Sequence, residues 1–209
     1  MTAPAVKAVF FDIGNVLLRF NPSEVLKEIA DAVGRPPRKV ADYLWTSHKI
    51  EALERGEFGT DELFRIFREE LGYAGSFARF RRIWCDHFTL ERRTASILRL
   101  VAKRAPTYLL SNTHALHYDH IRQNYAFTRH VHGAILSHEV GMRKPEPRIY
   151  AAAVKIAGVK PGQALLIDDL HPNVAAARKA GLRAILYKGP ADLRRRLTNL
   201  GLLARASSP

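Results

Sequence analysis

Residues 6–14 read VKAVFFDIG, and this stretch decides the fold. Its apolar, β-prone residues stop abruptly at Asp12, which is typical of a buried strand that runs into a turn. The same pattern occurs near the other end of the chain, where the apolar run 164–167 meets Asp168 and Asp169. We therefore expect two buried strands, each of which ends in acidic side chains.

Further strands and helices alternate from about residue 90 onward. The expected strands cover residues 107–110, 133–136, 164–167 and 183–187. They are continuous apolar runs rather than alternating ones, as strands require when helices cover both faces of a parallel sheet. The fold class that follows is α/β, a doubly wound, Rossmann-like parallel sheet.

Residues 17–89 have a different sequence pattern, with helix-start signals and no convincing strand from about residue 20 to 88. The expected helix starts are Asn21-Pro22, Pro36-Pro37, Thr60 and Ser76. This segment leaves the first strand at its carboxyl end, where ligands bind in such sheets. We therefore expect a core made of residues 1–16 and 90–209 and a small helical cap made of residues 17–89.

Composition excludes several classes of protein. With 47% apolar and 25% charged residues, the 209-residue chain has the make-up of a globular protein rather than a disordered one. Cys85 is the only cysteine, which excludes an internal disulfide, and we expect it to be a packed core thiol. No stretch approaches 18 apolar residues, and the N-terminus lacks the apolar segment of a signal peptide. We expect a soluble, cytoplasmic protein with no membrane partner.

The formal net charge of +13 is unevenly distributed. Residues 17–89 contain 12 Lys/Arg and 12 Asp/Glu, whereas the rest of the chain contains 21 and 8. An excess of positive charge on the core suits a phosphate-bearing substrate or a nucleic acid, and equally a merely solubilising surface. No nucleic-acid-binding motif accompanies basic clusters such as Arg194-Arg195-Arg196, so a nucleic-acid partner is the least favoured interpretation.

Chemistry-bearing side chains follow the expected strands at four places. They are Asp12, Ser111-Asn112, Lys144 and Asp168-Asp169. The first three places are ordinary when taken alone, whereas adjacent acids directly after an apolar strand cost energy unless they are paired or metal-bound. Because the carboxyl ends of parallel strands meet in one crevice, we expect the four to converge. Three close carboxylates cannot all stay ionised without compensation, which Lys144 and a Mg²⁺ ion would supply. Such a site leaves one carboxylate free to attack phosphorus.

These segments resemble the four ordered motifs of the haloacid dehalogenase (HAD) superfamily. The matching stretches are FFDIGNVL (10–17), LSNT (110–113), GMRKPE (141–146) and IDD (167–169). They occur in the family's order, with a helical cap of the first type (C1) between the first two. Within the superfamily, the chain most resembles the bacterial sugar-phosphatase branch that includes α-D-glucose-1-phosphate phosphatase.

The resemblance implies a Mg²⁺-dependent phosphatase acting on a small phosphorylated metabolite, with a sugar 1-phosphate as the favoured substrate. Asp12 would be the nucleophile that forms an aspartyl-phosphate, and Lys144 would steady the nucleophile and the phosphate. Ser111 and Asn112 would hold the phosphoryl group. The implied metal ligands are Asp12, the backbone carbonyl of Gly14, Asp168 and Asp169. Arg55, a loop cation in the expected cap, is a candidate substrate contact.

Gly14 departs from the pattern, since most family phosphatases have there a second Asp that protonates the leaving group. This proton transfer is typically worth about 10²–10⁴ in rate. Three explanations stay open: a leaving group that needs little protonation, a substitute acid, or a non-catalytic protein that binds phospho-ligands. The candidate substitutes are His48, His114 and His171.

A haloacid dehalogenase is a further alternative, because dehalogenases of the superfamily also lack the second Asp. They use no metal, however, and their fourth motif does not favour adjacent acids. Asp168-Asp169 therefore favours a phosphate over a halide substrate. The sequence does not indicate the oligomeric state.

Overall fold

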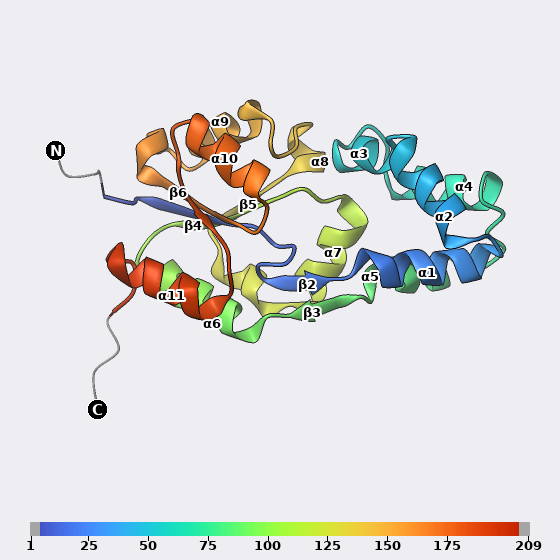
Figure 1. The fold of residues 1–209 in the computed structure, drawn as a ribbon, viewed down its shortest axis with the longest axis horizontal. Coiled ribbons are helices and arrows are strands. Elements are labelled where there is room, and N and C mark those ends of the chain that lie inside the picture. The colour runs from blue at the N-terminus through green and yellow to red at the C-terminus, as the bar shows by residue number, and fades with distance from the viewer. Residues whose placement is uncertain (1–4, 205–209) are drawn as a thin grey trace.

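The computed structural model describes residues 5–204, and at its centre is a five-stranded sheet in which all neighbouring strands are parallel (Figure 1). The strands are β1 (Ala8–Phe11), β4 (Thr107–Ser111), β5 (Gly133–Leu136), β6 (Ala164–Asp168) and β7 (Arg183–Leu186). Their order is β5-β4-β1-β6-β7, so the winding changes direction at the central β1. The predicted α/β class with a doubly wound parallel sheet is confirmed.

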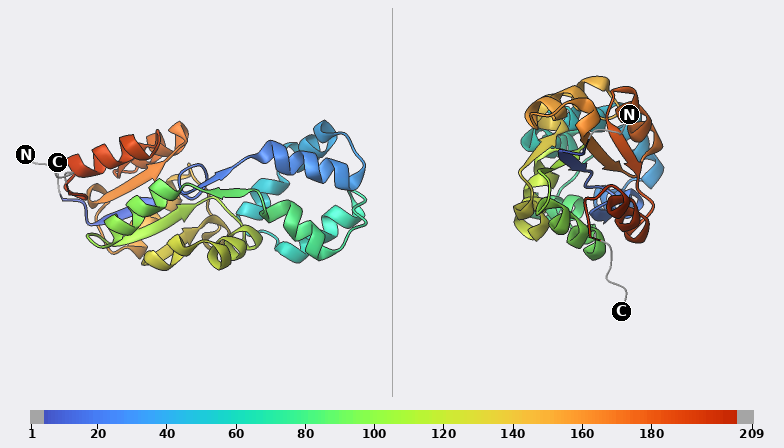
Figure 2. Two further views of the ribbon diagram at one scale, coloured as in Figure 1. Left: turned by 90° about the horizontal axis from the view of Figure 1, so that it is seen from below. Right: turned by 90° about the vertical axis from the view of Figure 1, so that its left-hand side faces the viewer.

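Helices cover both faces of this sheet (Figures 1 and 2). The core helices are α6 (Arg92–Ala102), α7 (Ala115–Asn124), the short α8 (Ser137–Val140), α9 (Pro147–Ile156), α10 (His171–Lys179) and α11 (Pro190–Asn199). Alternate residues of β1 serve the two faces, because successive side chains of a strand point in opposite directions. Val9 and Phe11 pack with α6 and α11, whereas Ala8 and Phe10 pack with α9 and α10.

A separate helical module, residues 22–85, lies beyond the carboxyl ends of the strands (Figure 2). It contains α1 (Pro22–Val33), α2 (Pro37–Ala41), a π-helical turn (Asp42–Thr46), α3 (Lys49–Glu54), α4 (Thr60–Glu69) and α5 (Phe77–Cys85). The module has an apolar cluster in which Phe67, Phe80 and Trp84 contact one another through their rings. Leu116 of the core helix α7 belongs to the same cluster, so the module also packs against the core.

Two helix boundaries of the module follow the capping rules used to predict them. Asn21 accepts a hydrogen bond from the Ser23 amide at 3.1 Å and begins α1, which ends at Gly34 with a left-handed φ of 64°. Ser76 accepts a hydrogen bond from the Arg79 amide at 3.3 Å and begins α5. Local side-chain chemistry thus fixes where these helices start.

Two short strands join the module to the core, β2 (Leu18–Phe20) and β3 (Phe88–Leu90), which pair in antiparallel fashion. We expected no strand from about residue 20 to 88. The two-stranded ribbon of β2 and β3, at the two edges of that segment, was therefore not predicted. Three residues are too few to display a period of two, so no sequence pattern marks them.

The segment 36–60 also differs from expectation. Instead of one helix starting at Pro36-Pro37, α2 ends at Ala41 and a π-helical turn follows, which leaves Trp45 45% exposed. The helix α3 was not anticipated, and Thr60 is the first residue of α4 rather than its cap.

The predicted packing of Cys85 is confirmed, since its side chain is fully buried. Within residues 5–204, no helix combines the length and apolarity needed to cross a bilayer.

Candidate active site

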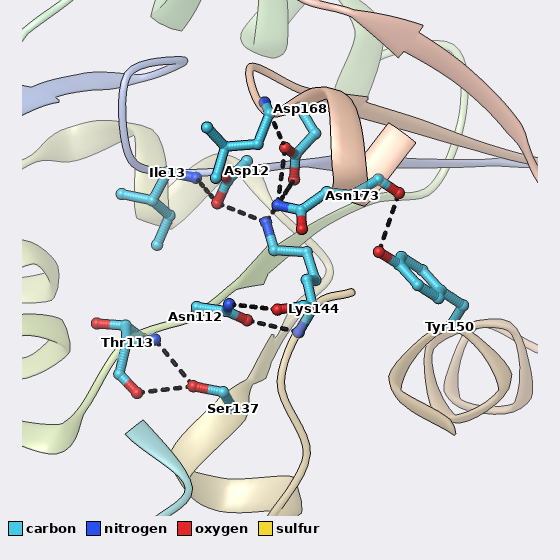
Figure 3. Close-up of polar contacts among 10 residues, drawn as sticks. Asp12, Ile13, Asn112, Thr113, Ser137, Lys144, Tyr150, Asp168 and Asn173 are labelled. Atoms are coloured by element: carbon cyan, nitrogen blue, oxygen red, sulfur yellow. Dashed lines mark hydrogen bonds and ion pairs between the residues drawn. The ribbon is translucent and has the colours of Figure 1, made fainter. Parts of the chain in front are cut away.

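The two acidic strand ends lie side by side (Figure 3). β1 and β6 are paired with Phe11 opposite Ile167, and the Asp12 amide donates to the Ile167 carbonyl at 2.9 Å. This register places the acids that follow each strand at one point, with carboxylate oxygens of Asp12, Asp168 and Asp169 all within 4.8 Å of one another. The structure thus brings together the three acids that the sequence singled out.

Lys144 reaches this cluster from the loop between α8 and α9 and is almost completely buried. Its Nζ lies 2.9 Å from Asp12 Oδ1 and 2.6 Å from Asp168 Oδ2. Burial acts to lower the pKa of Lys144, but the carboxylates of Asp12 and Asp168 outweigh it and raise that pKa above its ordinary value. The lysine therefore stays charged between the two acids.

The side chain of Asn112, a candidate phosphate contact, is hydrogen-bonded to the backbone of Lys144. Its Nδ2 donates to the Lys144 carbonyl at 2.8 Å, and its Oδ1 accepts from the Lys144 amide at 2.8 Å. Both ends of the amide therefore hold the backbone of Lys144. Ser111, the last residue of β4, is buried beside it, and its hydroxyl makes no hydrogen bond to any described residue.

Asp168 is the most fully engaged acid of the cluster. Besides the lysine, its carboxylate accepts hydrogen bonds from the Leu170 amide at 2.9 Å and from Asn173 Nδ2 at 3.0 and 3.1 Å. The Asn173 carbonyl in turn accepts from the Tyr150 hydroxyl at 3.0 Å. Sequence reasoning missed Asn173, whose one available signal is its place in the first turn of the helix that follows Asp168-Asp169.

The electrostatics of the cluster call for a cation. Burial, opposed by the charge of Lys144 and reinforced by that of Asp168, raises the pKa of Asp12 to about 7. Burial and the neighbouring Asp168 raise the pKa of Asp169 as well. Three carboxylates and one ammonium leave two uncompensated negative charges when all are ionised, and an all-oxygen donor set is what a hard divalent cation prefers. Asp12 and Asp169 have the fewest protein partners and are the best placed to hold such an ion.

The candidate replacement acids lie in different places. His48 is exposed in the helical module, where its Nδ1 lies 3.4 Å from Glu51, and His171 is exposed at the start of α10. His114 is buried and lines the same cavity as Gly14. Its Nε2 accepts a hydrogen bond from Trp84 Nε1 at 2.9 Å, and a tryptophan N–H can only donate.

His114 is therefore a neutral imidazole that carries its proton on Nδ1. Burial, together with the nearby His117 and His138, lowers its pKa well below the ordinary value, which agrees with that tautomer. The Nδ1 atom is buried without a hydrogen-bond partner among the described residues. His114 is the one candidate that shares the cavity, and it is a neutral donor rather than a cationic acid.

Arg55 does not line the cavity, contrary to what its expected role in substrate contact requires. Its guanidinium lies 2.8 Å from Glu146 in the core. A reciprocal pair joins Arg143 of the core to Glu54 of the module at 2.7 Å. Sequence cannot show such long-range partners, and the structure makes Arg55 part of the contact between module and core.

A cavity of about 220 Å³ lies between the core and the helical module. Gly14, Ser111 and Asn112 line its end next to the acid cluster, whereas Val25, Trp45 and other side chains of the module line the opposite end. A ligand with one end at the acids can therefore extend its other end under the module.

The fold and the site define an α/β protein in which a carboxylate cluster and a buried lysine lie at the carboxyl ends of the parallel strands. A family model of haloacid dehalogenase-like hydrolases matches residues 6–181, and the chain belongs to this family.

Proteins of known activity resemble the chain over nearly its whole length. It is similar to the sesquiterpene phosphatase astK of Aspergillus oryzae, at 26% identity over 84% of this chain and 87% of that protein. It is also similar to the D-ribitol-5-phosphate phosphatase of Bacteroides thetaiotaomicron, at 23% identity over 92% of this chain and 97% of that protein.

Solved structures show the same fold. A HAD family enzyme from Bacteroides thetaiotaomicron superposes with a TM-score of 0.84 at 22% identity, covering 93% of this chain and 99% of that one. A further structure of that enzyme is a complex with magnesium and inorganic phosphate.

Proposed function

We propose that this protein is a Mg²⁺-dependent phosphomonoesterase that works through an aspartyl-phosphate on Asp12. The observation that carries the proposal is the position of the Asp12 carboxylate, which is held by Lys144 beside two further acids. The neighbouring residues Gly14, Ser111 and Asn112 line a ligand-sized cavity. The relatives named as phosphatases and the magnesium–phosphate complex of the structural neighbour support it.

In the proposed reaction, Asp12 attacks phosphorus and displaces the leaving oxygen, and water then hydrolyses the acyl phosphate to regenerate the carboxylate. Lys144 favours the ionised form of Asp12 and offsets the charge of the phosphoryl oxygens, and the Ser111 hydroxyl is free to donate to one of them. Magnesium, held by Asp12, Asp169, the Gly14 carbonyl and, directly or through water, Asp168, would neutralise the phosphoryl group and orient it.

The helical module is proposed to act as a C1 cap, with the cap spanning residues 17–89 and the core spanning 1–16 and 90–209. Its ion pairs with the core support this role, because they hold it over the cavity. A small phosphorylated metabolite in the cytoplasm is the proposed substrate, and a sugar 1-phosphate is the prediction from the resemblance. The names of the relatives span a terpenoid and a polyol phosphate.

Phosphate release from p-nitrophenyl phosphate and from a panel of phosphate esters tests the proposal. We expect turnover with Mg²⁺, its loss with a chelator, and its loss in Asp12→Asn. Turnover that survives Asp12→Asn would contradict it. Saturable ester binding without turnover would favour the non-catalytic alternative, and halide release from 2-chloropropionate would favour a dehalogenase.

A further inference from the structure

The wall of the cavity beyond the acid cluster is mostly apolar, with Glu54, Thr113, His114 and His117 as its polar members. Phe20, Val25, Ile29, Trp45, Trp84 and Phe88 are among the side chains that form it. Most of these come from the helical module or the ribbon that joins it to the core, and Trp45 lies at the exposed edge. A group placed here meets aromatic rings and aliphatic side chains on most sides.

Several polar side chains of the cavity are committed to partners within the protein. Asn112 holds the Lys144 backbone with both ends of its amide, and Glu54 accepts from Arg143. The His117 Nε2 atom lies 2.9 Å from the Trp84 carbonyl, and the His114 Nε2 atom accepts from the Trp84 indole. The Ser111 hydroxyl and the His114 Nδ1 atom have no partner among the described residues, but they are fewer than the hydroxyls of a sugar or polyol. Each hydroxyl left unpaired would lose its hydration without replacement.

The cavity also lacks a cation for a second anionic group. No Lys or Arg is present among the described residues that line it. The two arginines of the module–core contact are paired instead, Arg55 with Glu146 and Arg143 with Glu54. A carboxylate or a second phosphate on the leaving group would therefore lie uncompensated in an apolar surrounding.

We propose that the preferred substrates carry a compact, apolar, uncharged organic group on the phosphate, rather than a sugar or polyol. This inference rests on the proposed phosphomonoesterase function and assigns the substrate class of the same site. An apolar cavity of about 150 Å³ is known to hold benzene. The cavity of about 220 Å³ therefore accommodates one ring or a short branched chain, and a longer chain would leave past Trp45.

The test compares two esters that differ in hydroxyls but share a primary leaving oxygen, cyclohexylmethyl phosphate and glucose 6-phosphate. We expect kcat/KM to be at least 10-fold higher for the cyclohexylmethyl ester. Trp45→Ala should lower kcat/KM several-fold more for this ester than for methyl phosphate, which is too small to reach residue 45. Phe77→Ala is the matched control, because Phe77 is an aromatic side chain of the same module that is 40% exposed and does not line the cavity.

Equal or better hydrolysis of glucose 6-phosphate or glucose 1-phosphate would overturn the substrate class and leave the phosphatase proposal intact. Absence of phosphate release from every ester, p-nitrophenyl phosphate included, would overturn the proposed function. In that case calorimetry with Mg²⁺ still measures whether the protein binds the cyclohexylmethyl ester more tightly than glucose 6-phosphate. A preference for the sugar ester would then contradict the assignment of the cavity as well.

Discussion

Gly56 of the helical module lies directly against the backbone carbonyl oxygen of His138 in the core. A Cβ atom at residue 56 would overlap this oxygen, and the residue also has a left-handed φ of 70°. Glycine is thus required here for two reasons, the backbone conformation and the close approach of the module to the core. The contact lies beside the ion pairs of Arg55 and Arg143, so this corner fixes the distance between the two parts.

Replacing Gly56 by alanine should push the module away from the core and lower kcat/KM for cavity-filling esters by at least 10-fold. Gly34→Ala is the matched control, because Gly34 has nearly the same φ of 64° but nothing within 4 Å of its Cβ position. Both variants should lose about 1 kcal/mol of stability from the strained φ. Steady-state kinetics and urea unfolding separate the effects, and equal kinetics in both variants would refute a spacing role for Gly56.

Gly14→Asp should restore the leaving-group acid that this chain lacks. A Cβ at residue 14 meets nothing within 4 Å, so the side chain has room. We expect kcat for an alkyl phosphate to rise at least 10-fold, because general acid catalysis is typically worth about 10²–10⁴ in rate. p-Nitrophenyl phosphate should change little, because its leaving group needs no proton. The neutral variant Gly14→Asn is the control, and an identical response from it would argue against proton transfer.

Asn112→Ala should lower kcat while leaving KM nearly unchanged. The variant removes both hydrogen bonds that hold the Lys144 backbone, so the ammonium loses its fixed position against Asp12. The expected loss in kcat is about 10- to 100-fold, from displacement of a group that must be held in register with the nucleophile. A rise in KM with unchanged kcat would instead show that Asn112 contacts the substrate, as the sequence led us to expect.

Acidification from pH 7 to pH 5 should destabilise the protein partly through His117. Burial, with His120 as a minor cause, lowers its pKa to about 4 although its bond to the Trp84 carbonyl opposes the shift. The unfolded chain, with a histidine pKa of about 6.5, takes up the proton first, so stability falls as pH drops from about 6.5 toward 4.

Because solvent still reaches part of this ring, we expect a contribution of about 1 kcal/mol at pH 5. In urea unfolding, the free energy of unfolding of His117→Gln should fall by about 1 kcal/mol less between pH 7 and pH 5 than that of the wild type. The exposed His130 supplies the control, and His130→Gln should retain the full dependence. An unaltered pH dependence in His117→Gln would refute the assignment.

The sheet could be predicted because its strands are short apolar runs, three of which run into Asp12, Ser111 or Asp168. These runs are local signals, and the observed strands begin at the expected residues 107, 133, 164 and 183. The convergence of Asp12 with Asp168 and Asp169 followed from the general geometry of parallel sheets.

The partners of individual side chains could not be predicted. The hydrogen bonds of Asn112 to the Lys144 backbone and the ion pair between Arg55 and Glu146 depend on how distant loops meet in space. The apolar cavity could not be predicted for the same reason. Residues that line it, such as Val25 and Ile121, are widely separated in the chain and look like ordinary helix residues in the sequence.

The ribbon of β2 and β3 makes the chain leave and re-enter the sheet domain at neighbouring points, where the Glu91 amide donates to the Leu17 carbonyl at 2.9 Å. In the topology of the sheet domain, the segment between β2 and β3 therefore takes the place of a single loop. Descendants of one ancestral gene could therefore exchange this insert for another without disturbing the strand order or the acids. Substrate choice and bond-breaking machinery would then evolve along separate paths.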